Sequence, residues 1–316
     1  MRLARANSAC DQTNPAITAL AAAGELDLLQ LDYAPPPPSA CSVAFLEQLR
    51  TLHKHFFLDP NLRLITNAGG GNVVSCVEAL GGYLREHGDS AMPITAVRGE
   101  NLLPQLSELI AAGIELTDEA TGDSLLAIEQ PLLAAQVELG AGPLDTAWEE
   151  GSRMIVAGCY DPAAPFIAAA KSTFQLAWDD YDALASVAVA AHAVRLVPAI
   201  AVILAPGEVT LELAAHEGLE TESFSRRLQK LAAGDAMRPH ADVASDVSSL
   251  ALRPTGFGGL SVTGVRGREP AGSWRVRLTF AAGLVVDSPQ TVQRWSRVPR
   301  DAVNVSVDTR PAAEWL

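Results

Sequence analysis

The 316-residue sequence has no apolar run long enough to cross a membrane, and aromatic residues make up only 5% of it. The most apolar region, residues 183–205, is interrupted by His192, Arg195 and Pro198, so it falls short of the roughly 20 residues that a membrane helix needs. The opening segment, MRLARANSACDQ, never develops the apolar stretch of a secretory signal peptide. We therefore expect a cytoplasmic protein that has no membrane partner.

Cysteine is scarce as well: the chain contains Cys10, Cys41, Cys76 and Cys159. No two of them have CxxC spacing, and none is paired with a histidine at the spacing of a zinc site. The pattern is typical of reduced thiols in a cytoplasmic protein. We expect no metal site, and the sequence indicates no particular cofactor.

Basic residues are outnumbered, with 23 Lys and Arg against 37 Asp and Glu, which argues against nucleic acid as a partner. A hydrophobic fraction of 48% excludes disorder as the main state. From residue 250 onward, nine Arg face five acidic residues, so the net charge of −14 is concentrated in residues 1–249. The excess of arginine after residue 250 either belongs to an ordinary solvated surface or forms a basic part that docks on the acidic part of a neighbouring subunit. We expect a homo-oligomer.

Short apolar runs alternate with helical patterns through the first two thirds of the chain. The predicted strands are residues 3–6, 26–31, 62–66, 94–97, 135–139, 154–157 and 198–205. The predicted helices are residues 15–23, 39–57, 73–87, 102–112, 143–150, 162–171 and 179–195. Strand–helix alternation of this kind predicts an α/β fold: a parallel sheet of βα units, doubly wound and Rossmann-like.

The pattern changes toward the end of the chain. Residues 207–247 are polar and contain one helical pattern near residues 222–233, which is typical of a connector. From residue 248, short alternating runs bounded by Gly and Pro predict antiparallel strands. We therefore expect an α/β domain at residues 1–206, a helical connector at 207–247, and a smaller α+β unit at 248–316 that ends in an extended arm.

Ligands of parallel α/β sheets bind outside the carboxyl ends of the strands. Polar or glycine residues follow each predicted strand, and together they predict a ligand site at that edge. Each one alone also fits an ordinary turn or helix cap. The candidate ligand-binding residues are Asn7, Asp11, Asn67, Gly69, Gly70, Gly71, Gly140, Gly142 and Cys159.

The segment NAGGGN, residues 67–72, is the most informative single motif. Three consecutive glycines allow close backbone approach, and the helix that follows offers free N–H groups to an anion or a carbonyl. It is not GxGxxG and lacks the acidic residue of a dinucleotide fingerprint, so nicotinamide binding is not indicated. A purely structural pair of glycine turns, here and at residues 139–143, is the alternative.

The acid–base candidates are Asp32, Glu100, Asp161 and His192. Glu100 also fits a helix cap, and a histidine on an apolar helix such as His192 is more often a buried structural residue. Cys159 has no neighbouring base in the sequence, which argues against a thiolate nucleophile.

Six collinear segments together resemble the acyclic terpene utilisation family (AtuA-type bacterial proteins). They are LDLLQLDY (26–33), LRLITNAGG (62–70), GENLLPQLSEL (99–109), ELGAGPLDTAWEEGSRMIVAG (138–158), AWDDYDALASVAVAAHAV (177–194) and SLALRPTGFGGLSVTGVRGREP (249–270). The resemblance covers most of the chain. It implies a role in bacterial breakdown of citronellol- and geraniol-like terpenes, which runs through acyl-CoA intermediates.

The chain departs from this family's pattern at two turns. After the first strand the family has a glycine-rich turn with an aspartate, whereas this chain has ANSACDQ, which keeps only Asp11. At the later turn, Cys159 stands where the family has Arg. The resemblance implies a catabolic enzyme that acts on a small carboxylate or acyl-CoA, with lyase- or hydratase-like chemistry. The departures leave a second hypothesis open, a non-catalytic binding or partner subunit.

Overall fold

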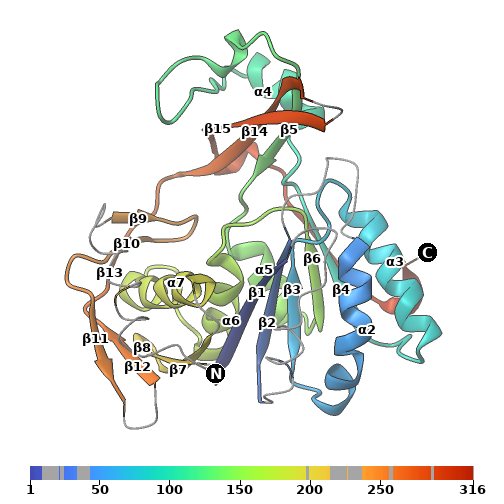
Figure 1. Ribbon diagram of the computed structural model, residues 1–316, viewed down its shortest axis with the longest axis vertical. Coiled ribbons are helices and arrows are strands. Elements are labelled where there is room, and N and C mark those ends of the chain that lie inside the picture. The colour runs from blue at the N-terminus through green and yellow to red at the C-terminus, as the bar shows by residue number, and fades with distance from the viewer. Residues whose placement is uncertain are drawn as a thin grey trace.

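The computed structural model describes residues 1–8, 21, 25–33, 43–196, 199–213, 226, 237–255, 259–285 and 288–315 (Figure 1). The strands are β1 (Arg2–Ser8), β2 (Leu28–Tyr33), β3 (Arg63–Thr66), β4 (Pro93–Arg98), β5 (Leu132–Val137), β6 (Met154–Ala157), β7 (Ala199–Ala205), β8 (Glu208–Leu213), β9 (Met237–Pro239), β10 (Ala244–Asp246), β11 (Ala251–Pro254), β12 (Gly259–Thr263), β13 (Arg266–Arg268), β14 (Ser273–Val285), β15 (Ser288–Pro299) and β16 (Ser306–Pro311). The helices are α2 (Val43–Leu58), α3 (Val73–Glu86), α4 (Leu106–Ala111), α5 (Gly142–Glu149), α6 (Ala164–Phe174) and α7 (Tyr181–Leu196).

A 10-stranded sheet in the order β11-β12-β8-β7-β1-β2-β3-β6-β4-β16 forms the centre of the protein. Its five middle strands, from β1 to β4, lie parallel to one another. The strands flanking them, β7 and β16, are antiparallel to β1 and β4. The structure therefore confirms a mixed α/β fold around a large sheet, whose parallel part comes from the predicted βα units.

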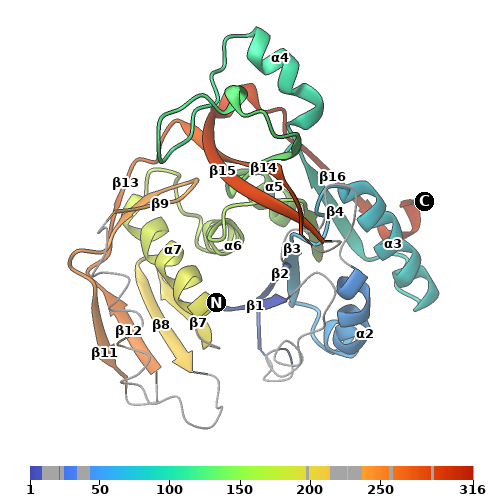
Figure 2. The ribbon, with the colours of Figure 1, turned by 45° about the horizontal axis from the view of Figure 1, so that its top comes forward.

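Helices cover both faces of the sheet, with α2 and α3 on one side and α5, α6 and α7 on the other (Figure 2). Because successive side chains of a strand point to opposite faces, each strand serves two cores. Leu3 and Leu28 join the core beneath α5–α7, whereas their neighbours Ala4 and Leu29 join the core beneath α2 and α3. None of the described helices has the length and apolar character that a membrane crossing requires.

β5 does not belong to the central sheet, although its apolar run predicts another parallel strand. It pairs antiparallel with β14, which pairs in turn with β15, so these strands form a separate three-stranded sheet. An apolar run marks a buried strand but carries no information about its partner, and this partner lies far along the chain. The β14–β15 hairpin lies beyond the carboxyl ends of the parallel strands (Figure 1).

The strands after residue 248 are shared among all three sheets. β11 and β12 extend the central sheet, β13 pairs with β10, and β16 pairs with β4 at the opposite edge. A sheet boundary therefore does not coincide with residue 248, and the residues expected to form an extended arm contribute β15 and β16. β8 of the central sheet lies in the segment expected to be a connector. The helices expected at 15–23 and 222–233 fall almost wholly outside the described residues.

Trp315 tests how firmly the last segment is packed. Its side chain is 5% exposed and lies in the core with α3, whose Arg85 donates a hydrogen bond of 3.0 Å to the Ala312 carbonyl. We expect Trp315→Ala to lower the free energy of unfolding by about 3 kcal/mol, because it leaves a cavity there. Trp178→Ala is the matched control, since Trp178 is 43% exposed. Equal losses in urea denaturation would contradict this packing.

Candidate functional site

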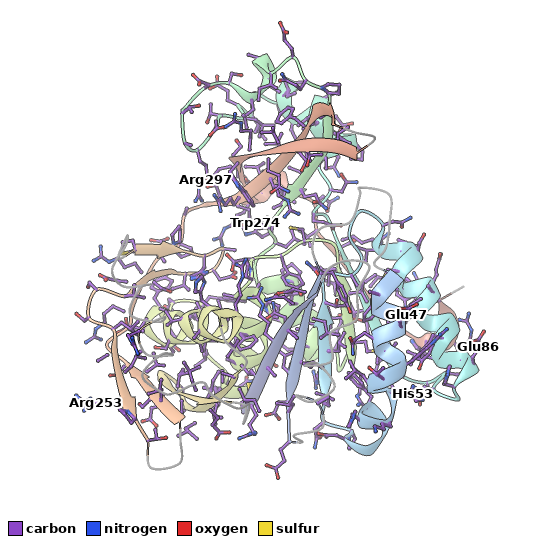
Figure 3. The ribbon with its side chains drawn as sticks, viewed as in Figure 1. Glu47, His53, Glu86, Arg253, Trp274 and Arg297 are labelled. Carbon is purple, nitrogen blue, oxygen red and sulfur yellow. The ribbon has the colours of Figure 1, made fainter. Side chains whose placement is uncertain are left out.

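A pocket of about 800 Å³ lies where the carboxyl ends of the parallel strands meet the β14–β15 hairpin. Figure 3 labels Trp274 and Arg297 at this junction. The predicted edge of the sheet is therefore hollow. Its lining residues are Arg5, Asn7, Asp32, Tyr33, Asn67, Glu119, Glu138, Cys159, Tyr160, Asp161, Pro162, Val189, His192, Arg195, Pro239, His240, Ala241, Val247, Leu250, Ser273, Arg275, Arg277, Trp295 and Arg297.

The structure brings part of the predicted site together in this pocket. The predicted residues that line it are Asn7, Asp32, Asn67, Cys159, Asp161 and His192. The predicted residues that do not line it are Gly69, Gly70, Gly71, Glu100, Gly140 and Gly142. Asp11 lies outside the described residues. The pocket thus contains polar residues at or just after the ends of β1, β2, β3 and β6, whereas the predicted glycines do not line it.

Asp32, at the end of β2, is held from three sides. It forms an ion pair with Arg5 of β1, and Tyr160 donates a hydrogen bond of 2.7 Å to Oδ1. Gln30 donates through Nε2 to both carboxylate oxygens, at 3.1 and 2.9 Å. Burial, together with the adjacent Asp32 charge, raises the pKa of Tyr160 well above its usual value. Asp32 is therefore a fixed counter-ion at the pocket floor and keeps the Tyr160 hydroxyl protonated.

Asp161 and His240 form a carboxylate–imidazole pair, with 3.4 Å between Asp161 Oδ1 and His240 Nδ1. The same carboxylate accepts hydrogen bonds from the N–H groups of Ala163 and Ala241, at 2.8 and 2.9 Å. Burial opposes ionisation of Asp161, but the His240 charge and these hydrogen bonds outweigh it and lower its pKa. Such a pair orients an imidazole ring and stabilises positive charge on it.

Glu138 follows β5 and is the second acid–base group of the pocket. Burial and the nearby charge of Asp161 raise its pKa to about 7, against the opposing effect of Arg275 and Arg277. A carboxyl group with this pKa is present in both protonation states at neutral pH, as acid–base catalysis requires. The sequence prediction missed Glu138 because it extended the strand through residue 139.

Cys159 lines the pocket, but its environment does not suit a nucleophile. Burial raises the pKa of its thiol to about 12, and the lowering effect of Arg277 does not compensate. The Arg277 Nη2 atom is 3.9 Å from Sγ and donates a hydrogen bond of 2.8 Å to Gln136 Oε1. The thiol therefore stays protonated at neutral pH and acts as a pocket wall.

The glycine turns have structural explanations. The N–H groups of Gly69 and Gly70 donate to the carbonyls of Ala157 and Asn67, each at 3.1 Å, so they are not available to an anion. A side chain on Gly140 would collide with the carboxylate of Asp242, which accepts a hydrogen bond of 2.8 Å from the N–H of Ala141. Gly69 and Gly140 therefore allow close packing behind the pocket.

Glu100 is buried behind the strand ends, 3% exposed, and both its carboxyl group and the Gly70 carbonyl lie close to Gly158. A side chain at Gly158 would collide with both. Burial raises the pKa of Glu100 to about 7, although hydrogen bonds from backbone N–H groups oppose the shift. These contacts place Glu100 in the packing behind the strand ends, and its predicted role as a catalytic acid or base stays a prediction.

Positive charge exceeds negative charge in the pocket. Five arginines line it against four carboxyl groups, one of them Glu138, and two histidines are also present. This excess stands out on a chain whose net charge is −14. A concave site of this kind favours an anionic ligand. Among the described residues, no cluster of three or more His, Cys, Asp or Glu side chains is placed to hold a metal ion.

Residues 11–195 match the profile of the acyclic terpene utilisation family protein AtuA, over more than half of the chain. The chain belongs to the acyclic terpene utilisation family. The match contains the pocket residues Asp32, Asn67 and Asp161, but it begins after Asn7 of β1 and ends before His240 and the hairpin arginines. No curated protein and no solved structure matches the chain.

Glu100→Gln tests the buried carboxyl group. Its pKa of about 7 means that the folded state retains a proton that the unfolded chain, with a pKa near 4.3, releases. The free energy of unfolding contributed by this group therefore falls as pH rises from about 4 to about 7. We expect the free energy of unfolding of Glu100→Gln, relative to that of the wild type, to be about 2 kcal/mol higher at pH 8 than at pH 5.

The matched control for this variant is Glu86→Gln, at the exposed end of α3, where Figure 3 labels Glu86. Its effect should be equal at the two pH values in urea denaturation. A Glu100→Gln gain that does not depend on pH would contradict the burial of this carboxyl group in the folded state.

Proposed function

We propose that this AtuA-type protein is an enzyme of acyclic terpene breakdown that acts on a carboxylated or CoA-linked small molecule by lyase- or hydratase-like chemistry. One observation carries the proposal: a single pocket combines an excess of arginine with two separate acid–base groups, the Asp161–His240 pair and Glu138. Membership of the family supports the metabolic context.

In such a reaction a base removes a proton from the carbon next to the carbonyl group, and an acid protonates the leaving hydroxyl. Glu138 takes the first role, because its pKa of about 7 keeps part of it ionised at neutral pH. His240, held in place by Asp161, takes the second role. Arg277 beside Glu138 stabilises the negative charge that develops on the substrate oxygen.

The fold suits this assignment. A doubly wound, Rossmann-like arrangement of the five parallel strands, which is part of the proposal, explains why the pocket lies at their carboxyl ends. We also propose that the protein is a cytoplasmic homo-oligomer, because a basic C-terminal part and an acidic body are complementary in charge. Light scattering that returns the mass of one chain would contradict the oligomer.

Proton exchange in D₂O tests the reaction class before the substrate is identified. The full chain is incubated with branched carboxylates and their CoA thioesters, saturated, hydroxylated and unsaturated, and mass spectrometry follows deuterium uptake and water addition. We expect Asp161→Asn and Glu138→Gln each to slow the reaction at least about 100-fold. The rate should change with an apparent pKa near 7, and this change should be lost in Glu138→Gln.

Asp182→Asn is the control for these variants, since Asp182 forms an exposed ion pair with Arg266 and does not line the pocket. Turnover that survives in both pocket variants would contradict the site assignment. Saturable binding of the same compounds with no exchange and no water addition would contradict the enzyme and favour the alternative, a binding or partner subunit.

A further inference from the structure

Two arginines face each other across the β14–β15 hairpin. Arg275 and Arg297 are direct cross-strand partners, and both line the pocket. Like charges at directly opposed positions destabilise a hairpin unless an anion lies between them. A negative charge between Arg275 and Arg297, on the hairpin side of the pocket, therefore stabilises the hairpin.

Glu119 supplies this negative charge, because its carboxylate bridges the two guanidinium groups. Its Oε2 accepts a hydrogen bond of 2.8 Å from Arg275 Nε, and its Oε1 lies 2.9 Å from Arg297 Nε. Among the described residues, neither arginine forms an ion pair with another carboxylate. One planar carboxylate, with one oxygen on each arginine, thus fits the space between them.

The backbone and side chain of Glu119 are held differently. The Glu119 N–H donates a hydrogen bond of 2.8 Å to the Trp295 carbonyl, which ties its turn to β15. The side chain, in contrast, is 24% exposed, and its partners Arg275 and Arg297 are 42% and 38% exposed. Ion pairs of such exposure contribute little free energy, so another carboxylate can replace this one while the turn stays in place.

The neighbours of the pair complete a site for one end of a ligand. The Arg275 guanidinium carbon lies 3.9 Å from the centre of the Trp295 ring, and Arg277, the cross-strand partner of Trp295, lies 6.0 Å from it. Trp295 and Arg277 also line the pocket. The Trp295 ring thus places apolar surface next to Arg275 in the pocket, as a hydrocarbon acid requires.

We propose that Arg275 and Arg297 form the subsite for the carboxylate group of the ligand, and that Glu119 occupies this subsite until the ligand carboxylate replaces it. The inference rests on the proposed function for the pocket and adds the group that the hairpin recognises. The Glu119 carboxylate swings to solvent when the ligand binds, so no charge is left uncompensated between the two arginines.

Isothermal titration at low ionic strength with the dicarboxylate glutarate, and separately with inorganic phosphate, tests the proposal on the full chain. Glu119→Gln removes the competing charge, so we expect it to bind glutarate about 5-fold more tightly than the wild type. Arg297→Gln should bind glutarate roughly 10-fold more weakly, because one charged partner is lost. Phosphate should bind more weakly than glutarate, since the bridging position fits a planar group.

The control is Asp118→Asn, because Asp118 belongs to the same turn, pairs with Arg294 at 3.7 Å and does not line the pocket. Its affinity for glutarate should equal that of the wild type, and circular dichroism melts establish that each variant is folded. The proposal is overturned if Glu119→Gln weakens binding as Arg297→Gln does, since Glu119 then only positions the arginines.

Tighter binding of phosphate than of glutarate would also overturn it, as would no binding of glutarate to either the wild type or Glu119→Gln. These results are separable from a failure of the proposed function. Titration needs no turnover, and the Asp161→Asn experiment leaves the hairpin pair unchanged.

Discussion

The antiparallel pairing of β14 with β5 is the constraint on which the pocket depends. In its register Val276 lies opposite Val137 and Leu278 opposite Ala135, so these buried residues alternate with Arg275 and Arg277. Because the side-chain period of a strand is two, a slip of one residue would move both arginines into the core and the apolar residues into the pocket. Burial of the apolar face of the hairpin therefore determines that Arg275 and Arg277 lie on the opposite face, toward the pocket.

Two distant parts of the chain contribute opposite halves of the pocket chemistry. The strand ends supply Asp32 and Asp161, which already pair with Arg5 and His240. The hairpin supplies Arg275 and Arg297, and both of them form their ion pair with Glu119. The excess of positive charge thus arises where the hairpin covers the sheet. The acidic residues elsewhere on the protein do not cancel this charge, because water and salt screen charges that lie far apart on the surface.

Much of the sheet could be predicted from the sequence, because βα units have local signals. The runs at β1, β2, β3 and β6 and the Asn72 cap of α3, which accepts a hydrogen bond from the Ser75 N–H, are such signals. They also locate Asp32 and Asp161 at one edge. The partner of β5 could not be predicted, since pairing over such a separation depends on which apolar faces remain to be covered.

The same distinction applies to the site. His240 lies in a segment without a motif, and Arg275 and Arg297 look like ordinary alternating strand residues until the hairpin is placed over the sheet. The NAGGGN motif has a second explanation in the structure, because close packing of Gly69 against the Ala157 carbonyl requires the same residue as phosphate binding does. Local sequence identifies turns, whereas only the tertiary arrangement shows whether their N–H groups are already used.

The most direct test of this account is a thermal-shift comparison between carboxylates and their neutral amides of the same shape. A ligand at 100 times its dissociation constant stabilises the folded state by about 2.7 kcal/mol, which raises the melting temperature measurably. The account predicts saturable shifts with the carboxylates only, and smaller shifts in high salt. Equal shifts with the amides, or shifts with cationic compounds alone, would contradict an anion site beneath the hairpin.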